Sequence, residues 1–193
     1  NKVIEKVLEL AKKCNYEKEH SHQVAKLSLK LFDELRGLHK LNKRHRVLLE
    51  AAALLHDIGW MKGRIRHHKT SRDIILQSQQ LPFTKSERIM VAMIARYHRR
   101  ALPKDSHKYY CDLSDVKKRQ LEKLAGLLRL ADGLDRQHMS VVKDLKCSVS
   151  QKLINVRLSA DEFSDWEEEV AKKKADLFEK VYQRNFSVKW SKN

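Results

Sequence analysis

Two adjacent side chains, His56 and Asp57, are the residues of this sequence best placed to do chemistry. They follow the apolar segment LLEAAALL (48–55), which predicts a buried helix that carries both side chains at its end. An ionised aspartate is costly to bury without a partner, and a single buried histidine is usually a hydrogen-bonded core residue. An imidazole and a carboxylate at one helix end can instead reach the same metal ion. The pair therefore indicates a divalent-metal site, although either residue alone would also fit a structural role.

Three further polar residues, His20, His98 and Asp132, are expected on apolar helix faces. Each lies four residues from an apolar position of its own predicted helix, and this spacing places both on one face. His22 is about 200° from His20 on the helix and should point outward. One inward polar residue is commonly a hydrogen-bonded core group. Several helices that each present His or Asp inward are better explained by a shared metal, which neutralises the carboxylates and binds the imidazoles.

The remaining histidines divide into two groups. His67 and His68 begin the basic segment HHKTSRDIIL, and two interpretations stay open for them: a metal ligand, or an exposed pair at a helix start. No comparable spacing supports the others, which are predicted to be surface residues: His39, His45, His107 and His138.

The chain is strongly basic, with a formal net charge of +16, and this favours anionic partners. Residues 61–110 hold twelve Lys and Arg against three Asp and Glu, in the same segment as His67 and His98. Arginine suits phosphate oxygens, so the cations near the His/Asp positions are candidate phosphate ligands. Singly, each could instead be a surface cation whose stem covers the core, and only two or three are expected to matter. The candidates are Lys69, Arg72, Arg96, Arg99, Arg100, Arg129 and Arg136.

Only five Gly and two Pro occur, which argues for long helices and against a many-stranded fold. Apolar periodicity and capping residues predict helices over 3–14, 17–39, 43–58 with a stop at Gly59, roughly 70–79, 85–98 behind a Thr84–Glu87 capping box, and from Ser114 to about Asp135. The pattern alternates over 145–158, which predicts a β-hairpin. A capping box at Ser159–Glu162 is expected to open a last helix to about Gln183. The fold class is therefore an all-α bundle (1–140) with a small α+β extension (141–193).

Composition also indicates a compartment. Three cysteines without paired spacing suggest reduced thiols in a cytoplasmic protein, and no transmembrane span or signal peptide is expected. The first residue is Asn rather than Met, so an upstream portion is expected to be missing.

The order His20, His56-Asp57, His67, His98, Asp132 resembles the HD superfamily of metal-dependent phosphohydrolases. The segments HSHQVAKLSLKLF, LLEAAALLHDIGW, HHKTS, IARYHR and LLRLADGLDR are more closely similar to the C-terminal domain of the exopolyphosphatase/guanosine-pentaphosphate phosphatase family. The likeness covers about residues 17–138 and is weaker in the hairpin and last helix. It implies an HD-type helical bundle.

The resemblance also implies roles. Four residues would be the primary metal ligands: His20, His56, Asp57 and Asp132. His67 and His98 would hold a second ion or face the substrate, and His67 is chosen because Ser71 matches the family's small residue four positions on. Asp57 and His98 would be the catalytic residues. The metal is left open among Mn, Fe, Mg, Zn and Co, as one ion or two.

Two departures from that family affect the function. Its members normally carry an actin-like catalytic domain ahead of this one, and nothing here resembles it; the family also often has His where this chain has Thr70. The expected activity is hydrolysis of a nucleotide, polyphosphate or related phosphoester by metal-activated water.

Two alternative ligands are left open. The domain could bind polyphosphate or another polyanion without catalysis. Nucleic acid ranks lower, because the sequence shows no zinc-finger, RRM or KH motif. No membrane partner is expected, and a homodimer through the last helix is left open.

Overall fold

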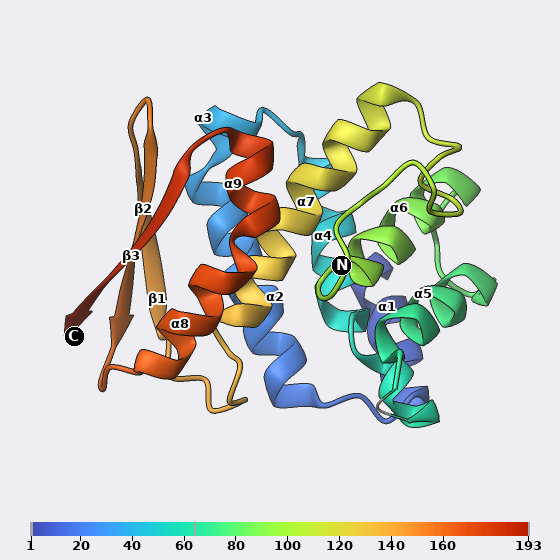
Figure 1. The fold of residues 1–193 in the computed structure, drawn as a ribbon. Coiled ribbons are helices and arrows are strands. Elements are labelled where there is room, and N and C mark those ends of the chain that lie inside the picture. The colour runs from blue at the N-terminus through green and yellow to red at the C-terminus, as the bar shows by residue number, and fades with distance from the viewer. Residues whose placement is uncertain (1, 64, 193) are drawn as a thin grey trace.

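The computed structural model describes residues 2–63 and 65–192, and its first part is a helical bundle (Figure 1). The helices before the sheet are α1 (Lys2–Lys13), α2 (Lys18–Glu34), α3 (Arg36–His39), α4 (Lys43–Leu55), the 3-10 helix η1 (Ile58–Lys62), α5 (His67–Gln77), α6 (Lys85–Arg96) and α7 (Asp115–Gly133). The second part contains β1 (Asp144–Val149), β2 (Leu153–Ala160), α8 (Asp165–Lys174), α9 (Asp176–Tyr182) and β3 (Asn185–Lys192). The mostly helical fold with a small β part confirms the predicted class.

Helices α4 and α7 form the centre of the bundle. The segment 48–55 is buried apart from Glu50, and α7 is buried from Leu124 to Gly133. Helix α2 packs on both, α6 also packs on both, and α1 and α5 cover α4 and α6 respectively. Burial of the apolar faces of these helices is the main force that holds the bundle together. No helix in the described part of the chain is long and apolar enough to cross a bilayer.

Several helix ends differ from the sequence prediction. The helix expected over 17–39 is interrupted at Leu35, where the backbone leaves the α-region and α3 begins. The helix expected over 43–58 ends at Leu55, because the chain turns at His56 and Asp57 into η1. Gly59 lies inside η1 and does not end α4. The third difference is that α5 begins at His67, so the histidine pair occupies its first turn.

Two predicted caps are confirmed. Thr84 accepts a hydrogen bond from the Glu87 N–H, and the Glu87 carboxylate accepts one from the Thr84 N–H, which completes the capping box of α6. Ser114 accepts from the Lys117 N–H at the start of α7. The segment 101–112 contains turns and no helix or strand.

The sheet contains the predicted hairpin and one strand more. β1 and β2 pair antiparallel, with Leu145 opposite Leu158. The predicted capping box at Ser159 is wrong, because Ser159 belongs to β2 and pairs with Asp144; Ser164 caps α8 instead. The sequence analysis missed β3, which pairs parallel to β2.

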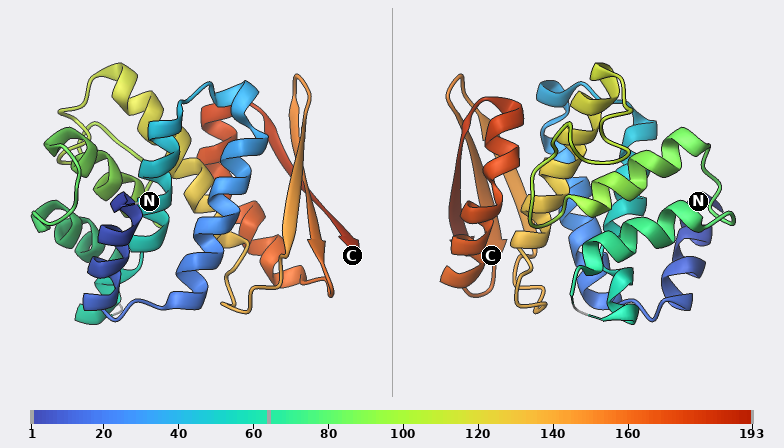
Figure 2. Two further views of the ribbon diagram at one scale, coloured as in Figure 1. Left: turned by 180° about the vertical axis from the view of Figure 1, so that it is seen from behind. Right: turned by 45° about the vertical axis from the view of Figure 1, so that its right-hand side comes forward.

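The sheet lies at one edge of the molecule, with all the helices on one side of it (Figure 2). β1 packs against α2, and β3 packs against α8 and α9. Two glycines let α7 approach the last helices closely: a Cβ at Gly126 would lie 3.3 Å from the Phe178 Cα, and one at Gly133 would lie 3.1 Å from the Ala171 Cα. This close packing brings α8 next to the end of α7.

Candidate metal centre

Six side chains from five parts of the bundle converge on one point. They are His20 in the first turn of α2, His56 and Asp57 between α4 and η1, His67 at the start of α5, His98 just beyond α6, and Asp132 near the end of α7. Asp57 Oδ1 lies 3.1 Å from His67 Nε2 and 3.3 Å from His98 Nε2. Asp132 Oδ1 lies 3.3 Å from His20 Nε2 and 3.6 Å from His56 Nε2.

Three of these imidazoles are oriented from behind through Nδ1. His56 donates from Nδ1 to the Ala53 carbonyl at 2.6 Å, and His98 donates to the Ala95 carbonyl at 2.7 Å. His20 Nδ1 lies 2.8 Å from an Asp135 carboxylate oxygen. Carbonyl oxygens can only accept, so Nδ1 of His56 and His98 carries the proton and Nε2 is directed at the cluster. Outer hydrogen bonds of this kind are typical of metal-binding histidines.

The inward atoms are buried and lack hydrogen-bond partners. Among the described residues, no hydrogen bond satisfies His20 Nε2, His56 Nε2 or Asp57 Oδ1. Two sets of three ligand atoms lie within 4.8 Å of one another, one from His20, His56 and Asp132 and one from His56, Asp57 and His98. Buried polar atoms without partners are costly, and a cation at the centre would satisfy them all. The residues present therefore fit a divalent metal, and the shared His56 leaves room for one ion or two.

The two carboxylates are held in the ionised form. Burial raises the pKa of Asp57, but the surrounding imidazoles, His56 first and then His67, keep it far below its usual range. Burial also raises the pKa of Asp132, and Lys174, followed by His20, lowers it well below its usual range. Lys174 reaches this carboxylate from the last residue of α8 and makes an ion pair with Asp132 Oδ2.

The histidines differ in their protonation. Burial lowers the pKa of His98 well below its usual value, despite the nearby Asp57 carboxylate. Burial also lowers the pKa of His20, but the Asp132 carboxylate 3.3 Å from Nε2 and the Asp135 carboxylate at Nδ1 outweigh it and raise the pKa to about 10. The pKa of His56 is raised, because Asp57 and Asp132 outweigh its burial. Burial therefore favours the neutral form of His98.

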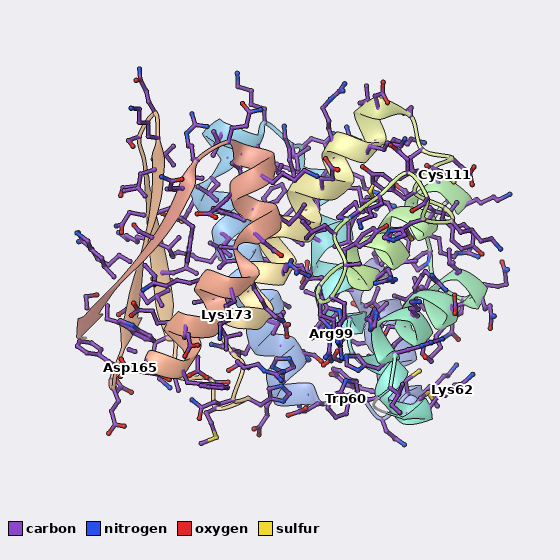
Figure 3. The ribbon with its side chains drawn as sticks, viewed as in Figure 1. Trp60, Lys62, Arg99, Cys111, Asp165 and Lys173 are labelled. Atoms are coloured by element: carbon purple, nitrogen blue, oxygen red, sulfur yellow. The ribbon has the colours of Figure 1, made fainter. Side chains whose placement is uncertain are left out.

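A pocket of about 740 Å³ opens over the cluster. Arg99, Arg100 and Arg136 line it together with Trp60 and Trp166, and Arg99 Nη1 lies 3.2 Å from His67 Nε2. Arg99 and Trp60 are labelled in Figure 3, between α8 on one side and α5 on the other. The cluster is thus accessible from a chamber with positively charged walls.

The predicted phosphate ligands occupy three kinds of position. Arg99, Arg100 and Arg136 line the pocket over the cluster, and a second pocket beside it contains Lys69 and Arg96. The other two, Arg72 and Arg129, have carboxylate partners within the protein, and their role stays a prediction. Arg72 makes an ion pair with Asp73, and Arg129 makes a two-bond pair with Asp176 and donates to two main-chain carbonyls.

Sequence reasoning missed or misplaced several residues of the site. Asp135 is buried behind His20; it stands three residues after Asp132, one helical turn on, and this spacing was its only signal. His138 was expected on the surface but is half-buried, and its ring stacks on His20 at 3.7 Å between centroids. His39 is likewise buried rather than exposed, and it bonds the Phe32 carbonyl and the Leu41 N–H.

The remaining histidines follow the prediction more closely. His22 is exposed, as predicted, and His45 and His107 are half-buried. His67 and His68 are both buried, so the interpretation as an exposed pair at a helix start is wrong. His68 lies in the wall of the second pocket, where burial and the nearby Arg96 lower its pKa to about 3.

Gly59 sets the distance between η1 and α5, and so helps to place His67. Its N–H donates to the Ser71 hydroxyl at 2.9 Å across the contact between the two elements. A Cβ at this position would lie 2.1 Å from the His67 carbonyl oxygen and 2.7 Å from the Ser71 nitrogen. Only a glycine allows the two backbones to approach this closely.

Fold and site together define a helical domain with a buried His/Asp cluster below a basic pocket. The family model described as Ppx/GppA phosphatase, domain III, matches residues 4–181, which is most of the chain. The protein therefore belongs to the Ppx/GppA phosphatase domain III family.

Proposed function

We propose that this protein is an HD-type, metal-dependent phosphohydrolase domain that acts on a nucleotide, polyphosphate or related phosphoester. The resemblance of its His/Asp order to the HD superfamily supports the class. In this proposal residues 1–140 form the metal-binding domain, and residues 141–193 form an extension that contributes Trp166 and Lys174 to the pocket.

One observation carries the proposal: the unsatisfied, buried atoms of His20, His56 and Asp57 that face a common point. A purely structural cluster would be expected to pair these atoms with hydrogen-bond partners. The outer bonds at Nδ1 support the same reading, because they fix each ring with Nε2 inward.

Each residue of the cluster has a proposed role. Four would hold the primary ion: His20, His56, Asp57 and Asp132. When bound, a divalent metal supplies Lewis-acid chemistry, which lowers the pKa of water and neutralises charge on a phosphoryl group. Asp57 would orient the reacting groups from its central position. His98, kept neutral by burial, can accept a proton at Nε2. His67 would hold a second ion or contact the substrate.

The pocket walls would bind the substrate's phosphate groups. Arg99, Arg100 and Arg136 present guanidinium groups, whose planar donor pattern suits phosphate oxygens. These cations would also stabilise the charge that accumulates on the phosphoryl oxygens during transfer.

A second candidate function is a polyphosphate- or polyanion-binding domain without catalysis. The ion pair of Lys174 with Asp132 favours it, because an ammonium group already balances one of the two carboxylates. This alternative keeps the basic pocket and gives the cluster only a structural role.

Elemental analysis by mass spectrometry of the purified protein tests the proposal. We expect stoichiometric transition metal in the parent and its loss in the His56→Ala/Asp57→Ala double variant. His22→Ala is the matched control: it removes an exposed histidine from the same helix as His20 and should leave the metal content unchanged.

The second stage is a phosphatase screen with nucleotides and polyphosphate at the metal found. Turnover that the double variant abolishes would support hydrolysis. No metal after purification, and none after addition of Mn, Fe, Co or Mg, would refute the hydrolase and leave the polyanion-binding domain.

A further inference from the structure

A second pocket, of about 500 Å³, adjoins the one over the His/Asp cluster, and its charged lining is of one sign. Its wall consists of Ile65, Arg66, His68, Lys69, Arg96, Arg99, Arg100 and Ala101. No Asp or Glu is present among these described lining residues. Arg99 and Arg100 also line the first pocket, so the two chambers share a wall.

Arg96 is the unusual member of this wall. Its side chain is only 6% exposed, yet its Nη1 has no hydrogen-bond partner among the described residues, and no carboxylate lies within ion-pair distance of it. Its nearest aromatic contact is the neighbouring Tyr97 ring, 5.4 Å from the guanidinium carbon.

Arg129 provides an internal comparison, because it is also 6% exposed. Its guanidinium donates to both oxygens of Asp176 and to the carbonyls of Tyr97 and Arg100. The same fold therefore satisfies one buried arginine completely and leaves the other without a counter-charge. A buried, unpaired charge is destabilising, so Arg96 is better explained by a ligand than by packing.

We propose that this second pocket, here called the Arg96 pocket, is an oxyanion site that binds a phosphate group with Arg96 as its buried ligand. A phosphate supplies the acceptors and the negative charge that Arg96 lacks, and the guanidinium fork matches its oxygens. Lys69 and Arg66 add positive charge at the pocket wall, and Arg99 and Arg100 face it from the shared side. His68 lines the same pocket, and an imidazole N–H can donate one further hydrogen bond.

The phosphate group can come from two sources: free inorganic phosphate, or one end of a chain of phosphates that also enters the first pocket. The second source rests on the proposed function, because it places the same molecule over the His/Asp cluster. The shared wall of Arg99 and Arg100 would then bind the middle of the chain.

Isothermal titration calorimetry with inorganic phosphate tests the site on the whole protein. Arg96→Gln should weaken phosphate binding roughly ten-fold or more, because it removes a buried charged donor. Arg157→Gln is the control: it removes the same charge from an exposed position on β2 and should change the affinity less than about two-fold by the rules for surface charges. Arg96→Lys should recover part of the affinity. Unchanged phosphate binding in Arg96→Gln would overturn the proposal.

Two further arms make the result specific. The His56→Ala/Asp57→Ala variant should still bind phosphate in the Arg96 pocket, so failure of the metal proposal and failure of this one are distinguishable. Tripolyphosphate separates the two sources. If both Arg96→Gln and Arg136→Gln weaken tripolyphosphate binding, a chain of phosphates spans both pockets. If inorganic phosphate binds as tightly as tripolyphosphate and only Arg96→Gln weakens binding, the ligand is the free ion.

Thermal stability gives an independent check. In buffer without phosphate, Arg96→Met should melt at or above the temperature of the parent, because it removes an unpaired buried charge. Arg129→Met, which leaves Asp176 and two carbonyls without their partner, should melt lower. A large loss of stability in Arg96→Met would show instead that Arg96 is a structural residue, and would overturn its assignment as a ligand.

Discussion

Substitution of Gly59 by alanine should shift the start of α5, and with it His67, without replacing any side chain of the His/Asp cluster. The added Cβ would lie 2.1 Å from the His67 carbonyl oxygen, 2.7 Å from the Ser71 nitrogen and 2.9 Å from the Thr70 Cβ. Two of these neighbours are backbone atoms, so no side-chain rotation can relieve the contact. The start of α5 must move away from η1 by about 1 Å, and His67 must move with it.

The cost can be bounded. Forcing an extra methyl group into a well-packed contact destabilises a protein by about 1–3 kcal/mol. In a domain of this size, 1 kcal/mol lowers Tm by roughly 2–4 °C, so Tm should fall by about 2–12 °C. The hydrogen bond from the Gly59 N–H to Ser71 would be strained as well, which places the effect toward the upper half of that range.

Gly37→Ala is the matched control, because a Cβ at Gly37 meets nothing within 4 Å. It should be neutral or stabilising by about 0.5–1 kcal/mol, the usual gain when alanine replaces glycine in a helix. Differential scanning calorimetry measures the Tm of both variants, and a metal titration measures their affinity for divalent ions. Equal melting of Gly59→Ala, Gly37→Ala and the parent would refute the role of this close contact.

Two other predictions concern stability alone. Arg129→Gln should destabilise the protein by about 3 kcal/mol in chemical denaturation, because Asp176 and two carbonyls lose their donor; a loss below about 0.5 kcal/mol would contradict this. The hydrogen bond from Arg44 lowers the pKa of Glu87 to about 2 in the folded protein. The Arg44–Glu87 pair therefore stabilises the fold fully above the pKa of an unfolded glutamate, about 4.3, and this stabilisation is lost as the pH falls through 2. The Tm difference between the parent and Glu87→Gln should therefore be constant near neutral pH and close between about pH 4.3 and 2. A difference that persists unchanged at pH 2 would show that this ion pair does not stabilise the fold.

The sequence was most informative where local rules decide the structure. Three kinds of prediction depend only on neighbouring residues, and each was confirmed. They are the helix caps at Thr84 and Ser114, the alternation in the hairpin, and the buried apolar run 48–55. The sequence analysis missed the strand β3, because its pairing partner β2 lies about thirty positions away along the chain. A parallel pair needs a long connection, here α8 and α9, and no short-range pattern marks it.

The candidate site shows the same division. Helical spacing was enough to predict that His20, His98 and Asp132 point inward, since an apolar helix face must be buried. It could not show that Lys174 reaches Asp132, nor that His138 stacks on His20, because both contacts depend on how the last helices and the loop after α7 pack. It also could not separate Arg96 from Arg129, whose burial is the same and whose partners differ.

The wide separation along the chain of the residues that meet at the cluster has a consequence for folding. His20 and Asp135 are 115 positions apart, so their contact closes a loop of most of the bundle. Closing such a loop costs more entropy than forming a local helix pair, and contacts of this range are made late. During synthesis, α1, α2 and α4 can associate as soon as they have emerged, whereas Asp132 and Asp135 join the histidines of the cluster only when α7 arrives. Any probe that recognises the assembled cluster therefore reports on chains that have nearly finished folding.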